Sequence, residues 1–267
     1  MPTELSPHNH RLVLVRDLLA PAGRREQQRF VAEGPTLLDE ADRSGLRPVE
    51  VYATGKGVQG GRTFIDRYEA AGIPVFHLTD QAFARISGVT TAWGLLGVFE
   101  IPRRTAGEIV ARPGLVLLLA GVNDPGNAGT LVRSAEAFGA AGVLFGRGGV
   151  DPWGPKVVRA AMGSLFRIPV ASCEPAEVVE LAAAADRPLV AADVDGEDLA
   201  VVGIPPNAVV AVGNERRGVR DWLPGWDRTV RIRQREATES LNAAVAGSIV
   251  LYEAARCQGL CQGAENP

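Results

Sequence analysis

The amino-acid sequence predicts an α/β protein made of two successive units. The chain has 267 residues, which is enough for one large domain or two smaller ones. Apolar, strand-like runs alternate with helical patterns along most of the sequence, as is typical of layered α/β folds. A polar stretch at 101–113, rich in proline and arginine, interrupts this alternation. We therefore expect one unit over 1–100, a linker over 101–113 and a second unit over 114–267.

The first half mixes both kinds of element. A helical pattern runs from Leu12 to Leu19 and stops before a proline. Gly34-Pro35 favours the start of a second helix, because proline suits the first helical turn. A third helical pattern surrounds Tyr68. Strand-like runs occupy four ranges: Arg29–Glu33, Val49–Ala53, Ile73–Leu78 and Leu95–Glu100.

The second half favours a parallel sheet. It opens with Leu115–Ala120, a continuous apolar run that is typical of a strand covered on both faces. Further buried strands are expected at Gly142–Phe145, Leu189–Ala192, Val209–Val212 and Thr229–Ile232. Helices fit between and after them, at Ala128–Phe138, Pro175–Ala185 and Ser240–Cys257.

Composition narrows the class of protein. The chain is 46% hydrophobic and 22% charged, which argues against a disordered chain or a fibre. Its apolar runs fall short of the roughly 20 residues that span a bilayer, and no secretory signal pattern is visible. Three cysteines suit a reducing cytoplasm, and the cysteine and histidine spacing favours no metal site. A net charge of −3 argues mildly against nucleic-acid binding by bulk electrostatics alone, although a local basic face remains open. We expect a cytoplasmic protein without a metal.

Familiar catalytic signatures are missing from the sequence. There is no G-x-x-x-x-G-K-[ST] phosphate loop and no G-x-G-x-x-G after a strand. A G-x-S-x-G nucleophile elbow is absent as well, which weakens a hydrolase interpretation.

Two polar segments follow predicted strands, where parallel sheets bind ligands. The first runs from Gly121 to Ser134, with Asn127 expected to cap the next helix and Arg133 in its second turn. The second runs from Gly213 to Gly218, where glycines let the backbone approach a flat ligand. Taken singly, each is equally typical of a capped loop or a surface turn.

A third polar segment opens the last predicted helix. It reads Glu239-Ser240-Leu241-Asn242, with Ser240 expected to cap the helix and Asn242 in its first turn. Ordinary helix capping explains this segment when it is taken alone.

In this order and spacing, the three segments resemble the three motifs of the SpoU (TrmH) family of RNA ribose 2′-O-methyltransferases, within the SPOUT class. The resemblance covers roughly 114–256. More weakly, Phe30–Gly34 and the helix after it resemble the small, ribosomal-protein-like domain that binds the substrate in many members. The matching motif residues are Asn127, Gly129 and Arg133; Gly213, Glu215 and Gly218; and Glu239, Ser240, Leu241 and Asn242.

The resemblance implies a carboxyl-terminal parallel α/β domain whose chain end threads a loop, giving a deep trefoil knot. It implies that this knot binds S-adenosyl-L-methionine, with Gly213, Ile232 and Leu241 contacting the cofactor chiefly through backbone groups. The implied partners are RNA, with rRNA as the first expectation, and a second copy of the chain in a homodimer.

The implied reaction is methyl transfer to a ribose 2′-hydroxyl, with Arg133 matching the family's main catalytic residue. Because a guanidinium is a poor general base, we expect Arg133 to hold the adjacent phosphate and to stabilise the developing alkoxide. Asn127 and Asn242 are expected to orient the ribose or Arg133. Glu215 is expected to fix the geometry of the arginine, and Ser240 to shape the pocket.

The sequence departs from the family after its last strand, where Arg233-Gln234 replaces the usual Pro-Met and alters the expected cofactor contacts. Three other functions stay open: a tRNA 2′-O-methyltransferase, a non-catalytic knotted RNA- or ribosome-binding protein, and a small-molecule methyltransferase. The intact catalytic residues argue against the second, since binding needs none of them. The separate first unit argues against the third, since a small substrate needs no docking module.

Overall fold

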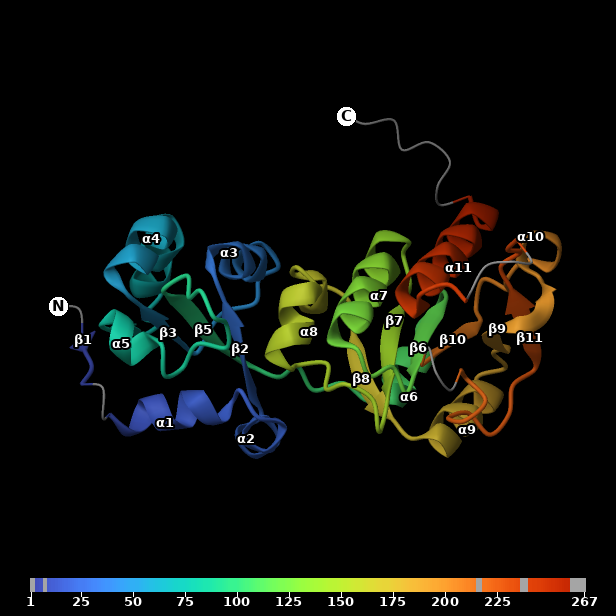
Figure 1. Ribbon diagram of the computed structural model, residues 1–267, viewed down its shortest axis with the longest axis horizontal. Helices are drawn as coiled ribbons and strands as arrows, with labels where there is room; N and C mark the ends of the chain where they lie inside the picture. The colour runs from blue at the N-terminus through green and yellow to red at the C-terminus, as the bar shows by residue number, and fades with distance from the viewer. Residues whose placement is uncertain (1–2, 7–8, 215–217, 236–239, 260–267) are drawn as a thin grey trace. The chain divides into compact units, whose positions relative to one another are not determined.

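The computed structural model describes residues 3–6, 9–214, 218–235 and 240–259, and the chain forms two compact units (Figure 1). The first unit comprises Met1–Pro102 and Trp153–Phe166, and the second comprises Arg103–Pro152 and Arg167–Pro267. The sequence patterns do not indicate that 153–166 leaves the second half of the chain to pack with the first unit.

The first unit is built on a five-stranded sheet in the order β1-β4-β3-β5-β2. Strands β1, β4 and β3 are parallel to one another, whereas β5 is antiparallel to both of its neighbours. The strands are β1 (Thr3–Glu4), β2 (Arg29–Glu33), β3 (Glu50–Ala53), β4 (Val75–His77) and β5 (Leu95–Glu100). The helices are α1 (His10–Asp17), α2 (Pro21–Gln27), α3 (Pro35–Arg43), α4 (Gly55–Ala70), α5 (Asp80–Phe83) and α8 (Pro155–Ala160).

Aromatic packing explains why 153–166 belongs to the first unit. Phe30 on β2 is fully buried, and its ring centroid lies 4.6 Å from that of Trp153 and 5.4 Å from that of Phe99. Phe166 stacks on the same two phenylalanines at 6.1 and 6.2 Å. Burying a large apolar side chain contributes about 1.5–3 kcal/mol, so these rings together stabilise the packing of 153–166 within the first unit by several kcal/mol.

The second unit has a six-stranded, fully parallel sheet in the order β11-β9-β10-β6-β7-β8. Its strands are β6 (Val116–Ala120), β7 (Gly142–Gly146), β8 (Val170–Cys173), β9 (Leu189–Asp198), β10 (Val209–Gly213) and β11 (Arg228–Arg231). Its helices are α6 (Ala106–Val110), α7 (Pro125–Ala137), α9 (Pro175–Ala184), α10 (Leu199–Val202) and α11 (Ala243–Cys257). The parallel sheet predicted from the apolar runs is confirmed.

Helices α7 and α11 lie side by side in this unit (Figure 1). Gly247 permits their close approach, because a Cβ there would lie 2.4 Å from Leu131 Cδ2 and 3.1 Å from Val212 Cγ2. The hydroxyls of Ser134 and Ser248 hydrogen-bond across the same contact at 2.7 Å. The last helix is therefore fixed against both α7 and β10.

Both expected helix caps are corrected by the structure. Helix α7 begins at Pro125, because the Asp124 side chain accepts a hydrogen bond from the Asn127 backbone at 2.7 Å. Helix α11 begins at Ala243, and Asn242 rather than Ser240 is its cap. Asn127 therefore lies in the first turn of α7, and Asn242 lies at the N-terminal cap of α11.

Five short helices were missed by the sequence patterns: α2, α5, α6, α8 and α10. All five have fewer than eight residues, so their apolar spacing covers less than two turns. Helix α6 falls within the stretch expected as a linker, and a capping box between Thr105 and Glu108 starts it. Among the described residues, no helix is long and apolar enough to cross a membrane.

Candidate functional site

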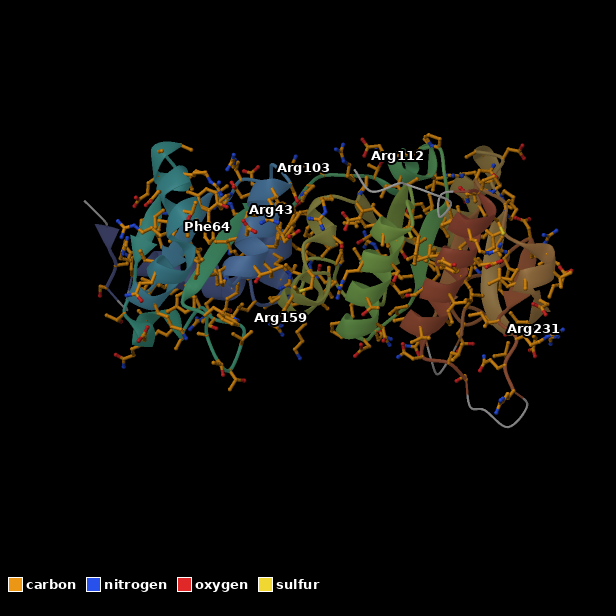
Figure 2. The ribbon with its side chains drawn as sticks, turned by 90° about the horizontal axis from the view of Figure 1, so that it is seen from above. Arg43, Phe64, Arg103, Arg112, Arg159 and Arg231 are labelled. Atoms are coloured by element: carbon orange, nitrogen blue, oxygen red, sulfur yellow. The ribbon has the colours of Figure 1, made fainter. Side chains whose placement is uncertain are left out.

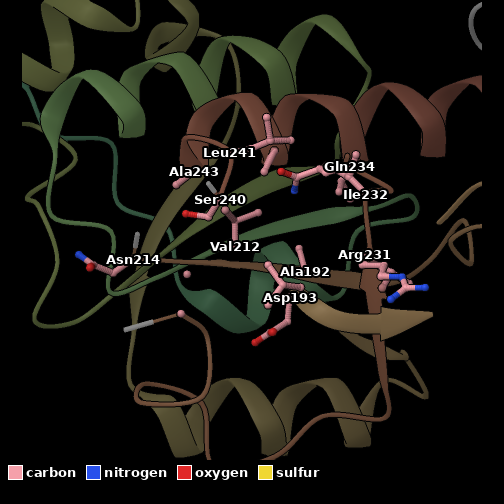
Figure 3. Close-up of a pocket in the computed structure, with 16 residues that line it drawn as sticks. Ala192, Asp193, Val212, Asn214, Arg231, Ile232, Gln234, Ser240, Leu241 and Ala243 are labelled. Carbon is pink, nitrogen blue, oxygen red and sulfur yellow. The ribbon is translucent and has the colours of Figure 1, made fainter. Parts of the chain in front are cut away.

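A cavity of about 290 Å³ opens in the second unit where β10 and β11 end and β9 passes beside them (Figure 3). Parallel sheets bind ligands at such strand ends. Most of its wall is apolar, and the start of α11 closes one side. Lining residues include Ala192, Asp193 and Val194; Val212, Gly213 and Asn214; Arg231, Ile232 and Gln234; and Ser240, Leu241 and Ala243.

Two glycines make one wall of the cavity almost entirely of backbone. A Cβ on Gly213 would lie 2.2 Å from the carbonyl carbon of Gly218, so no larger residue fits at that position. Gly218 has φ +64, and its backbone N–H donates to the Asn214 carbonyl at 2.7 Å. These constraints explain the glycines of the second motif.

Among the described residues that line the cavity, Asp193 supplies the one carboxylate. Its side chain is mostly buried, and it accepts a hydrogen bond from Arg220 Nε at 3.3 Å. The same guanidinium lies 5.7 Å from the ring centroid of Trp226. Arg220 is thus held from two sides, which fixes the Asp193 carboxylate in turn.

Of the two residues that depart from the family pattern, Arg233 and Gln234, only Gln234 lines the cavity. Arg233 pairs with Asp198 at 3.1 Å and does not line the cavity. Gln234 does line it, and in Figure 3 its amide is turned towards the Ser240 side while the Arg231 guanidinium extends away. The exchange of residue types therefore changes the cavity wall at Gln234 alone.

A hydrogen bond between two asparagines joins the first and third motifs. Asn242 Oδ1 accepts from the backbone N–H groups of Ala244 and Val245, at 2.9 and 3.2 Å. Capping therefore orients the amide, and Asn242 Nδ2 donates to Asn127 Oδ1 at 3.0 Å. Two residues 115 positions apart are brought together at the ends of α7 and α11.

The remaining predicted site residues fall in three places. Gly213, Ile232, Leu241 and Ser240 all line the cavity. Arg133 is exposed on α7, and its guanidinium has no hydrogen bond or ion pair within the described part of the chain. Glu215 and Glu239 lie outside the described residues.

Asp193 and Asn214 are cavity residues that the sequence analysis did not select. Asp193 directly follows a predicted buried strand, and Asn214 lies two residues after another, inside the Gly213–Gly218 segment, so position could have flagged both. Their residue types gave no further signal, because aspartate and asparagine are equally common in ordinary turns.

Comparisons with known proteins identify the family of this chain. The chain matches the SpoU rRNA Methylase family over residues 114–252. The 23S rRNA (guanosine(2553)-2'-O)-methyltransferase RlmP of Bacillus subtilis is 31% identical over 231 residues, covering 86% of this chain and 89% of the relative. A 23S rRNA (uridine(2479)-2'-O)-methyltransferase of Streptomyces viridochromogenes is 35% identical over 171 residues, 61% of this chain and 60% of the relative.

A solved structure gives the same result at the level of the fold. The AdoMet-bound rRNA methyltransferase of Sinorhizobium meliloti superposes with a TM-score of 0.84 at 28% identity, covering 96% of this chain and 98% of that one. The family match spans just over half of the chain and contains all three motifs. The chain therefore belongs to the SpoU rRNA methylase family.

Proposed function

We propose that this protein transfers a methyl group from S-adenosyl-L-methionine to a ribose 2′-hydroxyl of rRNA. One observation carries the proposal: the second and third motifs line a single cavity, and the Asn127–Asn242 hydrogen bond ties the first motif to its edge. Relatives named as 23S rRNA 2′-O-methyltransferases support the same reaction and substrate class.

The cavity fits the cofactor in size and chemistry. Its volume of about 290 Å³ lies near the lower end of the roughly 300–1,000 Å³ of small-molecule pockets. Val212, Ile232 and Leu241 offer apolar surface to a purine, and the Gly213 backbone wall offers amide and carbonyl groups. These residues would hold S-adenosyl-L-methionine, which supplies a methyl group on a positively charged sulfur.

The chain's own residues then act on the ribose. Arg133 keeps its charge in protein surroundings, so it holds the adjacent phosphate and stabilises the negative charge that develops on the 2′-oxygen. The phosphate accepts the 2′-hydroxyl proton, and methyl transfer would leave the cofactor as the neutral thioether. Asn127 and Asn242 orient the ribose or Arg133 as a hydrogen-bonded pair. Ser240 shapes the pocket wall, and Glu215 is assigned to fixing the arginine.

A homodimer is part of the proposal. Val245, Ile249 and Tyr252 recur at helical spacing on α11 and are 48, 37 and 45% exposed. The ring of Tyr252 contacts that of Phe138, the residue that follows α7, edge-on at a centroid distance of 5.6 Å, which extends the apolar face towards the neighbouring helix. A second copy would cover this face and bring another Arg133-bearing helix near the site.

We also propose a trefoil knot and a division of labour between the units. The contacts of α11 with α7, β9 and β10 support a chain end that returns to the sheet through a loop. The first unit, predicted from the sequence as 1–100, is assigned to binding RNA. The second unit, predicted as 114–267, is assigned to binding the cofactor and to methyl transfer.

Methyl transfer from labelled S-adenosyl-L-methionine to purified rRNA and tRNA tests the function. The wild type should label rRNA at a ribose that becomes resistant to alkaline cleavage, and Arg133→Ala should lose the label while still binding cofactor. Arg112→Ala is the matched control, because Arg112 is exposed and lies well away from Arg231 at the cavity (Figure 2).

Other outcomes separate the alternatives. Label on tRNA alone would keep the chemistry and replace the substrate. Cofactor binding without label on either RNA would favour the non-catalytic binding protein, and full activity of Arg133→Ala would refute the role of the arginine.

A further inference from the structure

Trp93 is the exception among the aromatic residues of the first unit. Its side chain is 59% exposed, whereas the other aromatic side chains of that unit are buried or half-buried. An indole that stays exposed to water does not contribute the stabilisation that the buried rings around it contribute to the fold. An exposed aromatic ring beside a cavity is typical of a binding surface.

The indole is held in place. Gly34 has φ +103, and a Cβ there would lie 3.3 Å from Trp93 Cδ1 and 3.5 Å from Cγ, so one side of the ring rests on bare backbone. Glu33 secures the preceding loop, accepting hydrogen bonds from Ser87 Oγ at 2.8 Å and the Gly88 backbone at 3.0 Å. The Trp93 backbone also bonds to this carboxylate. The ring is thus presented by a fixed loop.

A cavity of about 390 Å³ lies beside the indole in the same unit. Pro35 and Trp93 supply apolar walls, Gln59 supplies an amide, and Lys56 supplies an ammonium group. Gly60 leaves space, because a Cβ there would meet nothing within 4 Å. No carboxylate is found among the described residues that line this cavity, so it suits a flat, uncharged ring that is attached to an anionic group.

Lys56 differs from the arginines of the adjacent cavity. There, Arg43 pairs with Asp39 at 2.9 Å and Arg67 pairs with Asp42 at 2.6 Å. The ammonium of Lys56 has no ion pair or hydrogen bond within the part of the chain that the structure describes. Its charge is available for a ligand.

We propose that this Trp93 pocket, formed by Pro35, Lys56, Gln59, Gly60 and Trp93, holds one unpaired nucleobase of the RNA substrate. The base stacks on Trp93, Gln59 faces its polar edge, and Lys56 binds a neighbouring phosphate. Proteins that bind single-stranded RNA combine these elements, an aromatic face and a cation on the backbone. The inference rests on the proposed function, because it takes RNA as the substrate.

The test uses the full-length protein and unmodified 23S rRNA transcribed in vitro, with affinity measured by filter binding at several salt concentrations. Trp93→Ala should weaken RNA binding roughly 5- to 100-fold, because one base loses its stacking partner, and Trp93→Phe should retain most of the affinity. Lys56→Ala should lower the slope of log affinity against log salt by about 0.7–1, whereas Trp93→Ala should leave the slope unchanged. Lys156→Ala, at the only other lysine of the chain, controls for loss of charge alone.

The outcomes distinguish this inference from the function on which it rests. Cofactor affinity should match the wild type in every variant, and Trp93→Ala should raise KM for RNA while kcat persists at saturating RNA. A wild type that methylates rRNA beside a Trp93→Ala variant that binds rRNA equally well would overturn the pocket and leave the function standing. A wild type that binds cofactor but no RNA would overturn both.

Discussion

The Asn242 side chain performs two hydrogen-bonding tasks, and a single substitution separates them. Its oxygen caps α11, and its nitrogen donates to Asn127. In Asn242→Asp, a carboxylate still accepts from the helix amides but faces the Asn127 oxygen without a proton. We expect the stability of this variant to match the wild type, while kcat falls about 10²-fold through misplacement of the asparagine pair. Denaturation curves and single-turnover methyl transfer measure the two effects.

Asn242→Ala is the companion variant. It removes the cap as well, so it should lose about 1 kcal/mol of stability together with activity. Equal stability losses in the aspartate and alanine variants would contradict the separation, and an active aspartate variant would remove the Asn127 contact from the mechanism.

At the scale of elements, Arg187 ties three segments of the second unit together. It is 6% exposed, and its guanidinium donates to the carbonyls of Asn207 at 2.6 Å, Val110 at 2.5 Å and Gly114. Burial lowers the pKa of the guanidinium, because desolvation disfavours its charged form. We expect Arg187→Met to reduce the free energy of unfolding by about 3 kcal/mol, since each orphaned carbonyl costs on the order of 1 kcal/mol.

Urea denaturation checks this value, with Arg112→Ala as the exposed control. Arg187→Lys should give an intermediate loss, because one ammonium cannot reach three diverging carbonyls. If the free energy of unfolding of Arg187→Met equals that of the wild type, the hydrogen bonds from Arg187 contribute no more than the hydrogen bonds to water that they replace.

Glu33 gives the loop that carries Trp93 a pH dependence. Burial raises the pKa of this carboxyl above 4.5, outweighing the hydrogen bonds from Ser87, Gly88 and Trp93 that lower it. A raised folded-state pKa means that the group's contribution to stability is present below 4.5 and is lost as the pH rises through the folded-state value. The stability difference between the wild type and Glu33→Gln should therefore decline over that window.

Urea titrations of both proteins from pH 4 to pH 8 measure this decline, and a flat or rising difference would contradict it. Glu108→Gln should behave oppositely. The hydrogen bond from the Thr105 backbone lowers the pKa of Glu108, so its contribution is lost as the pH falls.

Sequence patterns predicted five of the six strands of the parallel sheet, most clearly where the run is continuously apolar, and Leu115–Ala120 corresponds to β6 almost residue for residue. They missed β8, Val170–Cys173, whose short run contains a serine. They placed Gly213 and Leu241 as cofactor contacts through the resemblance, and both line the cavity. The structural role of Arg187 was not predicted, because its partners are backbone carbonyls, and a pattern of side chains does not identify these. The packing of 153–166 within the first unit was not predicted, because it depends on ring contacts with Phe30, which lies far away in the sequence.

At the scale of the whole molecule, the proposed homodimer makes a prediction about the apolar face of α11. Ile249 lies at its centre, between Val245 and Tyr252, so Ile249→Arg would place a charge in the proposed dimer contact. We expect this variant to be a monomer in analytical ultracentrifugation, because an unpaired charge in such a contact costs several kcal/mol. The monomer should still bind S-adenosyl-L-methionine, because Gly213, Ile232 and Leu241 lie together in the cavity of a single copy. Methyl transfer should be lost, because the proposed dimer brings a second Arg133-bearing helix near the site. Val201→Arg on α10 is the control, because Val201 is 80% exposed outside this face. A dimeric, active Ile249→Arg variant would place the interface elsewhere.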